Sequence, residues 1–503
     1  MGFYYLVLIF ALAIFSFSIT PSSFALEDSC MTSNIKAAAY NNYKDALSKA
    51  ILFFEGQRGG ILPSSQRVKW RANSSLSDGQ PDNVDLSGGY YDAGDNVKFT
   101  WPMSFTVTLL SWAAIEYQNG ITSAGEINHL REAIRWGANF LVKAHSSSKG
   151  ATTLYSQVGY AIADHACWER PEDMDTPRTL YKISSSSPGS ELAGEAAAAL
   201  AAASIVFKTV DPKYSRTLLR RSTSLFKFAD QKQATFSLSC PFYCSFNGFQ
   251  DELLWAAAWV YKASGDKNYL KYVSNNQGWS KSVSEFSWDN KFAGAQTLLA
   301  NEYFAGNKNL EKYKNDAESF ICALMPGSGS VQFKTTPGGL LFIRDSSNLQ
   351  YATGATMVLF MYSGILDRSG GGGEGGVKCA SATYTSSQIK AFAKSQVDYI
   401  LGNNPKKMSY MVGFGDSYPK NLHHRGSSIP SIVSVHPDKI GCQDGYNWLN
   451  SAQPNPNVHT GAIVGGPDSS DNFLDSRSEY AHSEPTTYMN AAFVGSVAAL
   501  QST

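Results

Sequence analysis

The chain has 503 residues, with 42 lysines and arginines and 42 aspartates and glutamates, so its formal net charge is zero. This balance excludes the basic surface that nucleic acid or an anionic membrane attracts. Hydrophobic residues make up 43% and aromatic residues 13%, an ordinary globular mixture. No linker divides the chain, because the glycine-rich stretch from Ser369 to Gly376 lies inside a continuing helical pattern. We therefore expect one catalytic or binding domain, present as a monomer, with no nucleic acid partner.

The N-terminus carries a targeting signal. An apolar run from Phe3 to Ile19 is followed by Ser23-Phe24-Ala25, which predicts a secretory signal peptide over residues 1–25 and a mature domain over residues 26–503. An uncleaved membrane anchor is the alternative. Later stretches are predicted to be too short or too polar to cross a bilayer, so we expect a secreted, extracellular or cell-wall protein without a membrane anchor. Asn73-Ser74-Ser75 is the one sequon for N-glycosylation.

Helical periodicity dominates the rest of the chain. The predicted helices are Ala37–Phe54, Met103–Tyr117, Ile127–Ala144, Ser190–Lys208, Lys213–Phe228, Asp251–Ala263, Lys291–Phe304, Leu310–Leu324, Asn348–Leu366, Ser387–Leu401 and Thr486–Leu500. Some are apolar nearly all round, such as Ala196 to Val206, and should be buried on more than one side. Trp255 and Trp259 share a helix face and are predicted to be core residues. An all-α fold follows, as a bundle, a solenoid or a closed toroid; the absence of a repeat disfavours the solenoid.

The cysteines indicate an oxidising compartment. All seven follow the predicted signal: Cys30, Cys167, Cys240, Cys244, Cys322, Cys379 and Cys442. Some should pair, and Cys240 and Cys244 could close a small loop. Because seven is odd, at least one cysteine stays free or pairs with another chain. The scattered spacing argues against a zinc site.

Chemistry-bearing residues gather in three loops: Trp70–Trp101, His165–Asp175 and Tyr410–Glu484. In the first loop, Asp92 and Asp95 lie three residues apart around Gly94. We expect Gly94 to allow unusual backbone dihedral angles that aim both carboxylates at one point. Like charges held this close raise one pKa. A solvated turn or part of a cation site is the alternative reading of two such aspartates.

The last loop carries Leu422-His423-His424-Arg425 and the acidic stretch that ends at Glu484. Carboxylates from both ends of the chain could perform glycoside hydrolysis, in which one acid protonates the leaving oxygen while another activates water. Pro485 suits the first position of the last helix, which would place Glu484 near the helix cap. That location favours ionised Glu484, whereas a general acid must be protonated. Burial, or the negative charge of Asp475, Asp92 or Asp95, would have to outweigh it.

Four motifs together resemble glycoside hydrolase family 9, and in particular the secreted plant endo-β-1,4-glucanases. They are Tyr91-Asp92-Ala93-Gly94-Asp95, Cys167-Trp168-Glu169-Arg170-Pro171-Glu172-Asp173-Met174, Leu422-His423-His424-Arg425-Gly426, and Phe473-x-Asp475-x4-Tyr480-x3-Glu484-x-Thr486-x3-Asn490. The resemblance covers about Asn41 to Val494. It implies a single-domain (α/α)6 barrel, also described as a six-hairpin toroid, and an inverting reaction on β-1,4-glucan that needs no cofactor. No carbohydrate-binding module is expected after the last helix.

The resemblance also implies roles for individual residues. Asp95 resembles the catalytic base, Asp92 its partner in holding the water, and Glu484 the proton donor. Asp475 resembles a residue that supports the site or tunes a pKa, although it could instead pair with Arg477. These four carboxyl groups and His423 form the predicted catalytic set.

Other residues resemble substrate-binding positions: His423, Arg425, Tyr480, Trp168 and Tyr91. Two of them have structural alternatives. His423 could be a histidine satisfied within its loop, and Trp168 could be core rather than a platform for a pyranose ring.

A structural calcium site is implied by the resemblance, at Asn247, Gly248, Asp251, Glu252 and Asp289. Hard oxygen ligands suit calcium. Asp251 and Glu252 could instead simply favour the N-terminus of the next helix.

We therefore predict an endo-β-1,4-glucanase that acts on amorphous cellulose or a related cell-wall glucan. One alternative is a non-catalytic glucan-binding wall protein on an enzyme scaffold. Another is the same scaffold acting on xyloglucan or mixed-linkage glucan.

Overall fold

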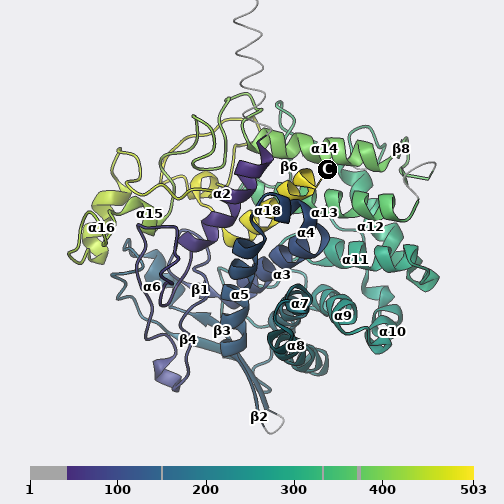
Figure 1. The fold of residues 1–503 in the computed structure, drawn as a ribbon, viewed down its shortest axis with the longest axis horizontal. Helices are drawn as coiled ribbons and strands as arrows, with labels where there is room; N and C mark the ends of the chain where they lie inside the picture. Colours follow the sequence, from purple (N-terminus) through teal and green to yellow (C-terminus); the bar gives the residue numbers. More distant parts are fainter. Residues whose placement is uncertain (1–41, 149–150, 331–332, 371–374, 503) are drawn as a thin grey trace, which may run out of the picture. The chain divides into compact units, whose positions relative to one another are not determined.

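The computed structural model describes residues 42–148, 151–330, 333–370 and 375–502. The predicted signal peptide and Cys30 lie outside these residues. Six described helices form a closed inner ring, because each packs on the next and α18 packs on α3 (Figure 1). In ring order they are α3 (Thr100–Glu116), α7 (Ser190–Phe207), α9 (Gln250–Ser264), α11 (Phe292–Phe304), α13 (Asn348–Arg368) and α18 (Thr487–Gln501). Their side chains are buried on nearly every side, as helices apolar all round require.

Six further helices cover this ring from outside. They pack in turn on α18, α3, α7, α9, α11 and α13, and are α2 (Tyr43–Gly56), α5 (Ile127–Ala144), α8 (Pro212–Lys232), α10 (Lys267–Asn275), α12 (Glu311–Leu324) and α14 (Ser386–Ile400). Each outer helix keeps polar residues on the face away from the ring. The predicted (α/α)6 barrel is therefore confirmed.

Eleven of these twelve helices were predicted, with α5 correct at both ends and Trp255 and Trp259 fully buried. The prediction missed α10, because this short helix is mostly polar and buries only Val273. It also missed an antiparallel sheet in which β3 (Ala151–Val158) pairs with β1 (Lys98–Phe99), β2 (His145–Ser148) and β4 (Leu180–Ile183).

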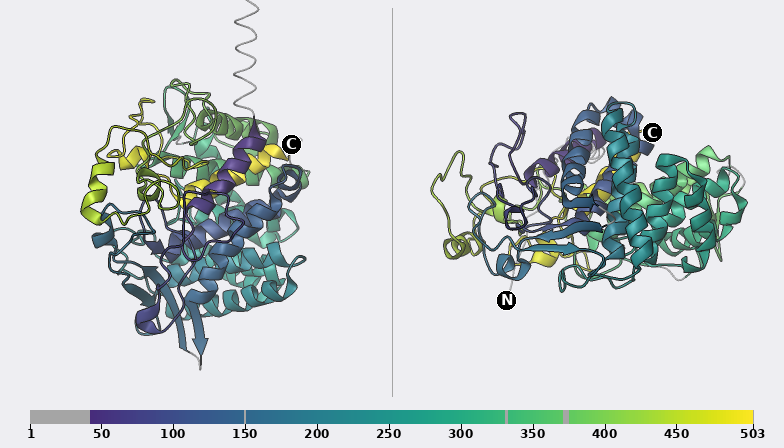
Figure 2. Two further views of the ribbon diagram at one scale, coloured as in Figure 1. Left: turned by 60° about the vertical axis from the view of Figure 1, so that its left-hand side comes forward. Right: turned by 90° about the horizontal axis from the view of Figure 1, so that it is seen from below.

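The remaining elements are short. The strand pairs are β5 (Lys334–Thr335) with β6 (Leu341–Phe342), and β7 (Val377–Lys378) with β8 (Thr383–Tyr384). The short helices are α4 (Gln118–Ser123), α6 (Ala161–His165), α15 (Arg425–Ser428), α16 (Cys442–Leu449) and α17 (Tyr480–Ser483), and the 3-10 turns are η1 (Gln80–Asp82), η2 (Gln277–Trp279) and η3 (Lys308–Leu310). The loop after α2 and the long loops around α15 and α16 lie side by side (Figure 2).

One helix corrects the expectation about membrane spans. By length and hydropathy alone, α7 could cross a bilayer, and it is the one such helix among the described residues. In the structure 89% of it is buried inside the barrel, where it belongs to the inner ring.

The described residues hold three disulfides: Cys167–Cys442, Cys240–Cys244 and Cys322–Cys379. The small loop predicted between Cys240 and Cys244 is therefore closed. The other two bonds join segments far apart in the sequence, which spacing alone did not identify.

Candidate active site

The two ends of the chain meet at Gly94. Its N–H donates to Glu484 Oε1 at 3.0 Å, and its carbonyl accepts from Arg425 N at 3.0 Å and Nη1 at 3.1 Å. A Cβ on Gly94 would lie 2.0 Å from His423 O and 3.0 Å from Glu484 Oε1. Only glycine permits this approach of the two loops.

The reason for a glycine at this position differs from the predicted one. Gly94 is not among the described residues with positive φ, whereas Gly88 and Gly89 are, at 88° and 70°. The expectation of unusual dihedral angles at Gly94 was therefore wrong. Close packing requires this glycine, and the turn that precedes it uses the other two.

Glu484 lies just outside the last helix. The cap of α18 is Thr486, whose side chain accepts from Met489 N, so Pro485 precedes the cap and does not occupy the first helical position. The predicted position of Pro485 was therefore wrong. Glu484 instead follows α17, with its carboxyl group against Gly94.

The surroundings of Glu484 favour its neutral form. Burial and, to a smaller extent, Asp164 raise the pKa of Glu484, the Gly94 N–H and Arg425 lower it, and together they bring it to about 7. A carboxyl group with this pKa is protonated for a substantial fraction of the time near neutral pH. It can therefore donate a proton to a leaving group.

Asp92 and Asp95 are both 5% exposed and close enough to affect each other's ionisation. Burial raises both pKa values; the next contribution comes from Asp95 for Asp92, and from Asp164 for Asp95. The Tyr243 hydroxyl donates to Asp92 Oδ2, while Asp92 Oδ1 has no hydrogen-bond partner among the described residues. Burial raises the pKa of Asp95 to about 7, so this carboxyl group is ionised for a substantial fraction of the time near neutral pH.

Gln57 braces the loop that carries this pair, and the sequence analysis missed it. Its side-chain N–H groups donate to Tyr91 O at 3.2 Å and Ala93 O at 2.8 Å. Its Oε1 accepts from the Nε2 atoms of His424 and His459 at 2.7 and 2.9 Å. The two carbonyl oxygens and the two imidazole rings that Gln57 contacts are all buried. Each of these hydrogen bonds therefore replaces one that the group would otherwise make to water.

His423 presents a hydrogen-bond acceptor. Its Nδ1–H donates to Arg477 O at 2.6 Å, which fixes the proton on Nδ1 and leaves Nε2 unprotonated. Burial lowers the pKa of His423 to about 4, so the ring is neutral at neutral pH. Trp168 and Tyr480 pack edge-on against it, with centroids 4.9 and 6.0 Å away.

The chain matches known proteins over most of its length. The family model "Glycosyl hydrolase family 9" matches residues 43–497. The chain belongs to glycosyl hydrolase family 9. An endoglucanase of Phaseolus vulgaris is 65% identical over 476 residues, covering 94% of each chain. The structure of an endoglucanase from the termite Nasutitermes takasagoensis is 40% identical with a TM-score of 0.81, covering 92% of this chain and 99% of that one.

A second solved relative shows a bound sugar. It is a C. cellulolyticum cellulase in complex with cellobiose, 29% identical with a TM-score of 0.78, covering 92% of this chain and 98% of that one. The predicted family, the class of glycoside hydrolase and the endo-β-1,4-glucanase type are confirmed by these comparisons.

Three residues of this family 9 enzyme that were predicted to bind substrate are almost fully buried: Tyr91, Trp168 and Arg425 are each 2% exposed. The Tyr91 hydroxyl donates within the protein, to Ser74 or Ser75. Arg425 donates to the backbone oxygens of Gly94, Cys167 and Asp164. Trp168 donates to Ser428 and packs behind His423. The structure therefore does not leave these side chains free for a sugar, and Trp168 is no exposed stacking platform.

Tyr480 differs from these three, because it is 61% exposed beside His423. Its ring is open to solvent, and its contact with a sugar stays a prediction.

Asp475 supports the loop before His423. It accepts from the N–H groups of Lys420 and Asn421 at 2.7 and 2.9 Å. The Arg477 side chain instead donates to Asn455 and to two backbone carbonyls, so the alternative of an Asp475–Arg477 ion pair is not observed among the described residues.

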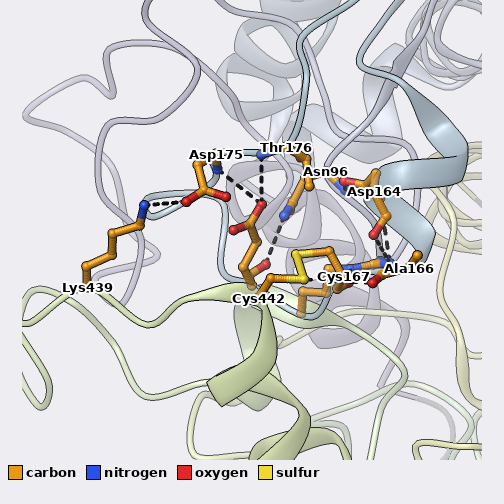
Figure 3. The surroundings of a disulfide bond; sticks show 10 residues. Asn96, Asp164, Ala166, Cys167, Asp175, Thr176, Lys439 and Cys442 are labelled. Carbon is orange, nitrogen blue, oxygen red and sulfur yellow. Dashed lines mark hydrogen bonds and ion pairs between the residues drawn. A yellow bond between two sulfur atoms is a disulfide. The ribbon is translucent and has the colours of Figure 1, made fainter.

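Asp164 and His165 were not singled out individually from the sequence, although His165 begins a loop noted for its polar residues. Asp164 accepts from Asn96 N, close to the disulfide that joins the next segment to α16 (Figure 3). His165 Nε2 lies 3.9 Å from Asp95 Oδ2. Ligand atoms of Asp95, Asp164 and His165 all lie within 4.8 Å of one another. This spacing couples their charges.

Three of the predicted calcium residues, Asp251, Glu252 and Asp289, lie around the buried Lys291. The Lys291 ammonium is 3.3 Å from Glu252 Oε1, and the backbone N–H of Lys291 donates to Asp251 Oδ2 at 2.8 Å. Asp289 accepts from Asn247 Nδ2 at 2.7 Å. Asp251 Oδ1 and Glu252 Oε2 are buried without a hydrogen-bond partner among the described residues. Two such oxygens are suitable donors to a hard cation.

Proposed function

We propose that this endo-β-1,4-glucanase hydrolyses internal bonds of amorphous cellulose or a related cell-wall glucan with inversion at the anomeric carbon. The observation that carries the proposal is the position of Glu484, bound to the N–H of Gly94, next to Asp95. The pKa values of Glu484 and Asp95 are both raised to about 7, so near neutral pH one carboxyl group can hold a proton while the other is ionised, as an acid and a base require.

In the proposed reaction Glu484 gives its proton to the glycosidic oxygen as the bond from that oxygen to the anomeric carbon breaks. A water attacks the same carbon from the opposite face, and Asp95 takes the proton that the water loses. Asp92, whose Oδ1 lacks a protein partner, helps to orient that water. No cofactor is needed for this chemistry.

Substrate contacts follow from exposure. The unprotonated Nε2 of His423 accepts a hydrogen bond from a sugar hydroxyl, and the exposed ring of Tyr480 packs against a pyranose face. Trp168, Arg425 and Tyr91 act from behind by holding these groups in place, and Asp475 holds the loop that carries His423.

The test uses Asp95→Asn and Glu484→Gln, with Glu132→Gln on the surface of α5 as the matched control. Both active-site variants should lose hydrolysis of carboxymethylcellulose while their circular dichroism stays that of the wild type, and the control should keep full activity. Activity near wild type in either variant removes that residue from the mechanism. NMR should show the α-anomer first, and a β-anomer formed first would contradict inversion.

The alternatives separate in the same assays. A glucan-binding protein without activity would release no reducing sugar from carboxymethylcellulose. A panel that includes xyloglucan and mixed-linkage glucan, with analysis of product length, distinguishes the substrates and endo from exo action.

We also propose a secreted or cell-wall monomer without a membrane anchor. We also propose that Asn73 is N-glycosylated. Asn73 is exposed, and its Oδ1 accepts a hydrogen bond from Leu62 N. This arrangement leaves the amide nitrogen of Asn73 accessible to a glycosyltransferase. A mass shift on treatment with a glycosidase, absent in Asn73→Gln, tests this.

Calcium would be held by Asn247, Gly248, Asp251, Glu252 and Asp289, where it would stabilise the segment before α9. Chelation should then lower the melting temperature, and metal analysis of the purified protein should find calcium. An unchanged melting temperature together with no bound calcium would reject the site.

A further inference from the structure

We propose that the Cys240–Cys244 disulfide is a positioning element of the active site, and that its reduction lowers kcat while the barrel stays folded. The bond closes a ring of five residues, in which Phe242 and Tyr243 lie between the cysteines. This inference rests on the proposed function, because it concerns the efficiency of the same carboxyl pair.

Tyr243 connects this ring to Asp92. Its hydroxyl donates to Asp92 Oδ2 and lies 3.3 Å from the hydroxyl of Tyr488. Its ring is buried between Phe99 and Trp288, with both centroids 4.7 Å away. The hydrogen bond occupies one oxygen of Asp92 and leaves the other oxygen for a water.

Phe242 connects the same ring to Asp95. It packs on His165 with centroids 4.3 Å apart, and His165 Nε2 lies 3.9 Å from Asp95 Oδ2. Two adjacent aromatic residues within one small disulfide ring therefore reach both members of the carboxyl pair.

The backbone of the ring itself is held by bonds within its own segment, while its flanks are anchored by the N–H groups of Phe236 and Phe246, which donate to Glu191 and Asp289. No helix or strand lies between Lys232, where α8 ends, and Gln250, where α9 begins, and all residues of this segment are described. Within the ring, Cys240, Phe242 and Tyr243 donate backbone N–H groups only to Ser237 and Ser239 of the same segment. A cross-link removes alternative loop conformations that these local bonds leave available.

The bond is accessible to a reductant because Cys240 is exposed and Cys244 partly exposed. The thiolate of a dithiol attacks one sulfur and forms a mixed disulfide; its second thiol then displaces the cysteine. The reductant is oxidised to a cyclic disulfide. It supplies the two electrons and two protons that convert the bond into the free thiols of Cys240 and Cys244.

The experiment compares wild type with C240S/C244S and with the matched control C322S/C379S. The control bond joins α12 to the residue that follows the short strand β7, and neither element carries an active-site residue. We expect C240S/C244S to lower kcat by about tenfold to a hundredfold with a smaller change in KM, since a displacement of about 1 Å near reacting groups costs about a hundredfold. C322S/C379S should lower the melting temperature and keep kcat.

Tyr243→Phe in both backgrounds separates positioning from general damage. It should lower kcat in the wild type and add little in C240S/C244S, because the hydroxyl is already displaced there. Losses that multiply independently, or a C240S/C244S kcat within about twofold of wild type, would overturn the inference.

Reduction of the folded protein covers the case in which C240S/C244S does not fold. Treatment with dithiothreitol, followed by mass analysis of labelled thiols, should show activity falling as Cys240 and Cys244 become labelled and returning on reoxidation. Full activity with both thiols labelled would overturn the inference. Wild-type activity on carboxymethylcellulose tests the proposed function separately, so a loss confined to the variants is not confused with an inactive protein.

Discussion

Replacing Gly94 by alanine perturbs the contact between the two loops with a single methyl group. The added Cβ would lie 2.0 Å from His423 O, a backbone atom that cannot rotate away. The loops must separate by more than 1 Å to reach ordinary contact, at about 3.4 Å or more. The Gly94–Glu484 bond at 3.0 Å and the Arg425 bonds to Gly94 O would lengthen with them.

The expected effect on activity is larger than the effect on stability. Overpacking of this kind costs about 1–3 kcal/mol of folding free energy. A misplacement of about 1 Å near reacting groups reduces the rate by about a hundredfold. The bond from the Gly94 N–H to the neutral carboxyl group of Glu484 contributes about 0.5–1.5 kcal/mol, and its loss would reduce the rate further if the proton donor shifts. We expect kcat to fall by about two to three orders of magnitude.

The assay is the release of reducing sugar from carboxymethylcellulose, with thermal unfolding measured on the same samples. Gly278→Ala is the matched control, because a Cβ there meets nothing within 4 Å. This control should keep its activity and melting temperature. A Gly94→Ala enzyme with kcat within about threefold of wild type would show that the approach of the loops is not needed for catalysis.

Further predictions concern charge and support. Activity should fall as pH rises through about 7, because Glu484 loses its proton there. The raised pKa of Glu484 also stabilises the folded protein at pH values below the ordinary pKa of a glutamate, and this stabilisation is lost as pH rises through about 7. Glu484→Gln should therefore flatten this part of the profile of melting temperature against pH. Asp164→Asn removes a negative charge that raises the pKa of Glu484 and Asp95, so the pH–rate profile should move to lower pH, and an unmoved profile would contradict that coupling. Gln57→Leu should cost about 1–3 kcal/mol in chemical denaturation, since two buried carbonyls lose their donor. Tyr480→Ala should raise KM by about threefold to tenfold with kcat less affected, as expected for loss of an aromatic contact of about 0.5–1.5 kcal/mol; an unchanged KM would remove Tyr480 from substrate binding.

The helical scaffold was predictable because two kinds of helix carry two different patterns. Helix α7 is apolar on all sides and lies in the inner ring, whereas α5 has one apolar stripe and lies outside. Elements without such a pattern were missed. In α10 only Val273 is buried, and the strands around β3 pair with partners that local sequence does not reveal.

Within the site, motifs located the acids but not the groups that hold them. Asp92, Asp95 and Glu484 belong to recognisable patterns in the sequence. Gln57 ends an ordinary amphipathic helix, and its importance depends on contacts with residues more than 30 positions away. Burial likewise reversed the expectation for Trp168, because sequence alone does not show which face of a loop is covered.

The ionisation of Glu484 shows why a small error in a helix boundary matters for chemistry. With Pro485 in the first turn, the carboxyl group would lie at the positive end of α18 and favour its charged form. In the structure Thr486 is the cap, and the cap bond is made by its own side chain. Glu484 keeps one stabilising N–H, from Gly94, and burial outweighs that bond. Glu484 can therefore hold its proton because two residues, Pro485 and Thr486, separate it from the first residue of the helix. A change that moves the cap toward Glu484 should make it a carboxylate at neutral pH.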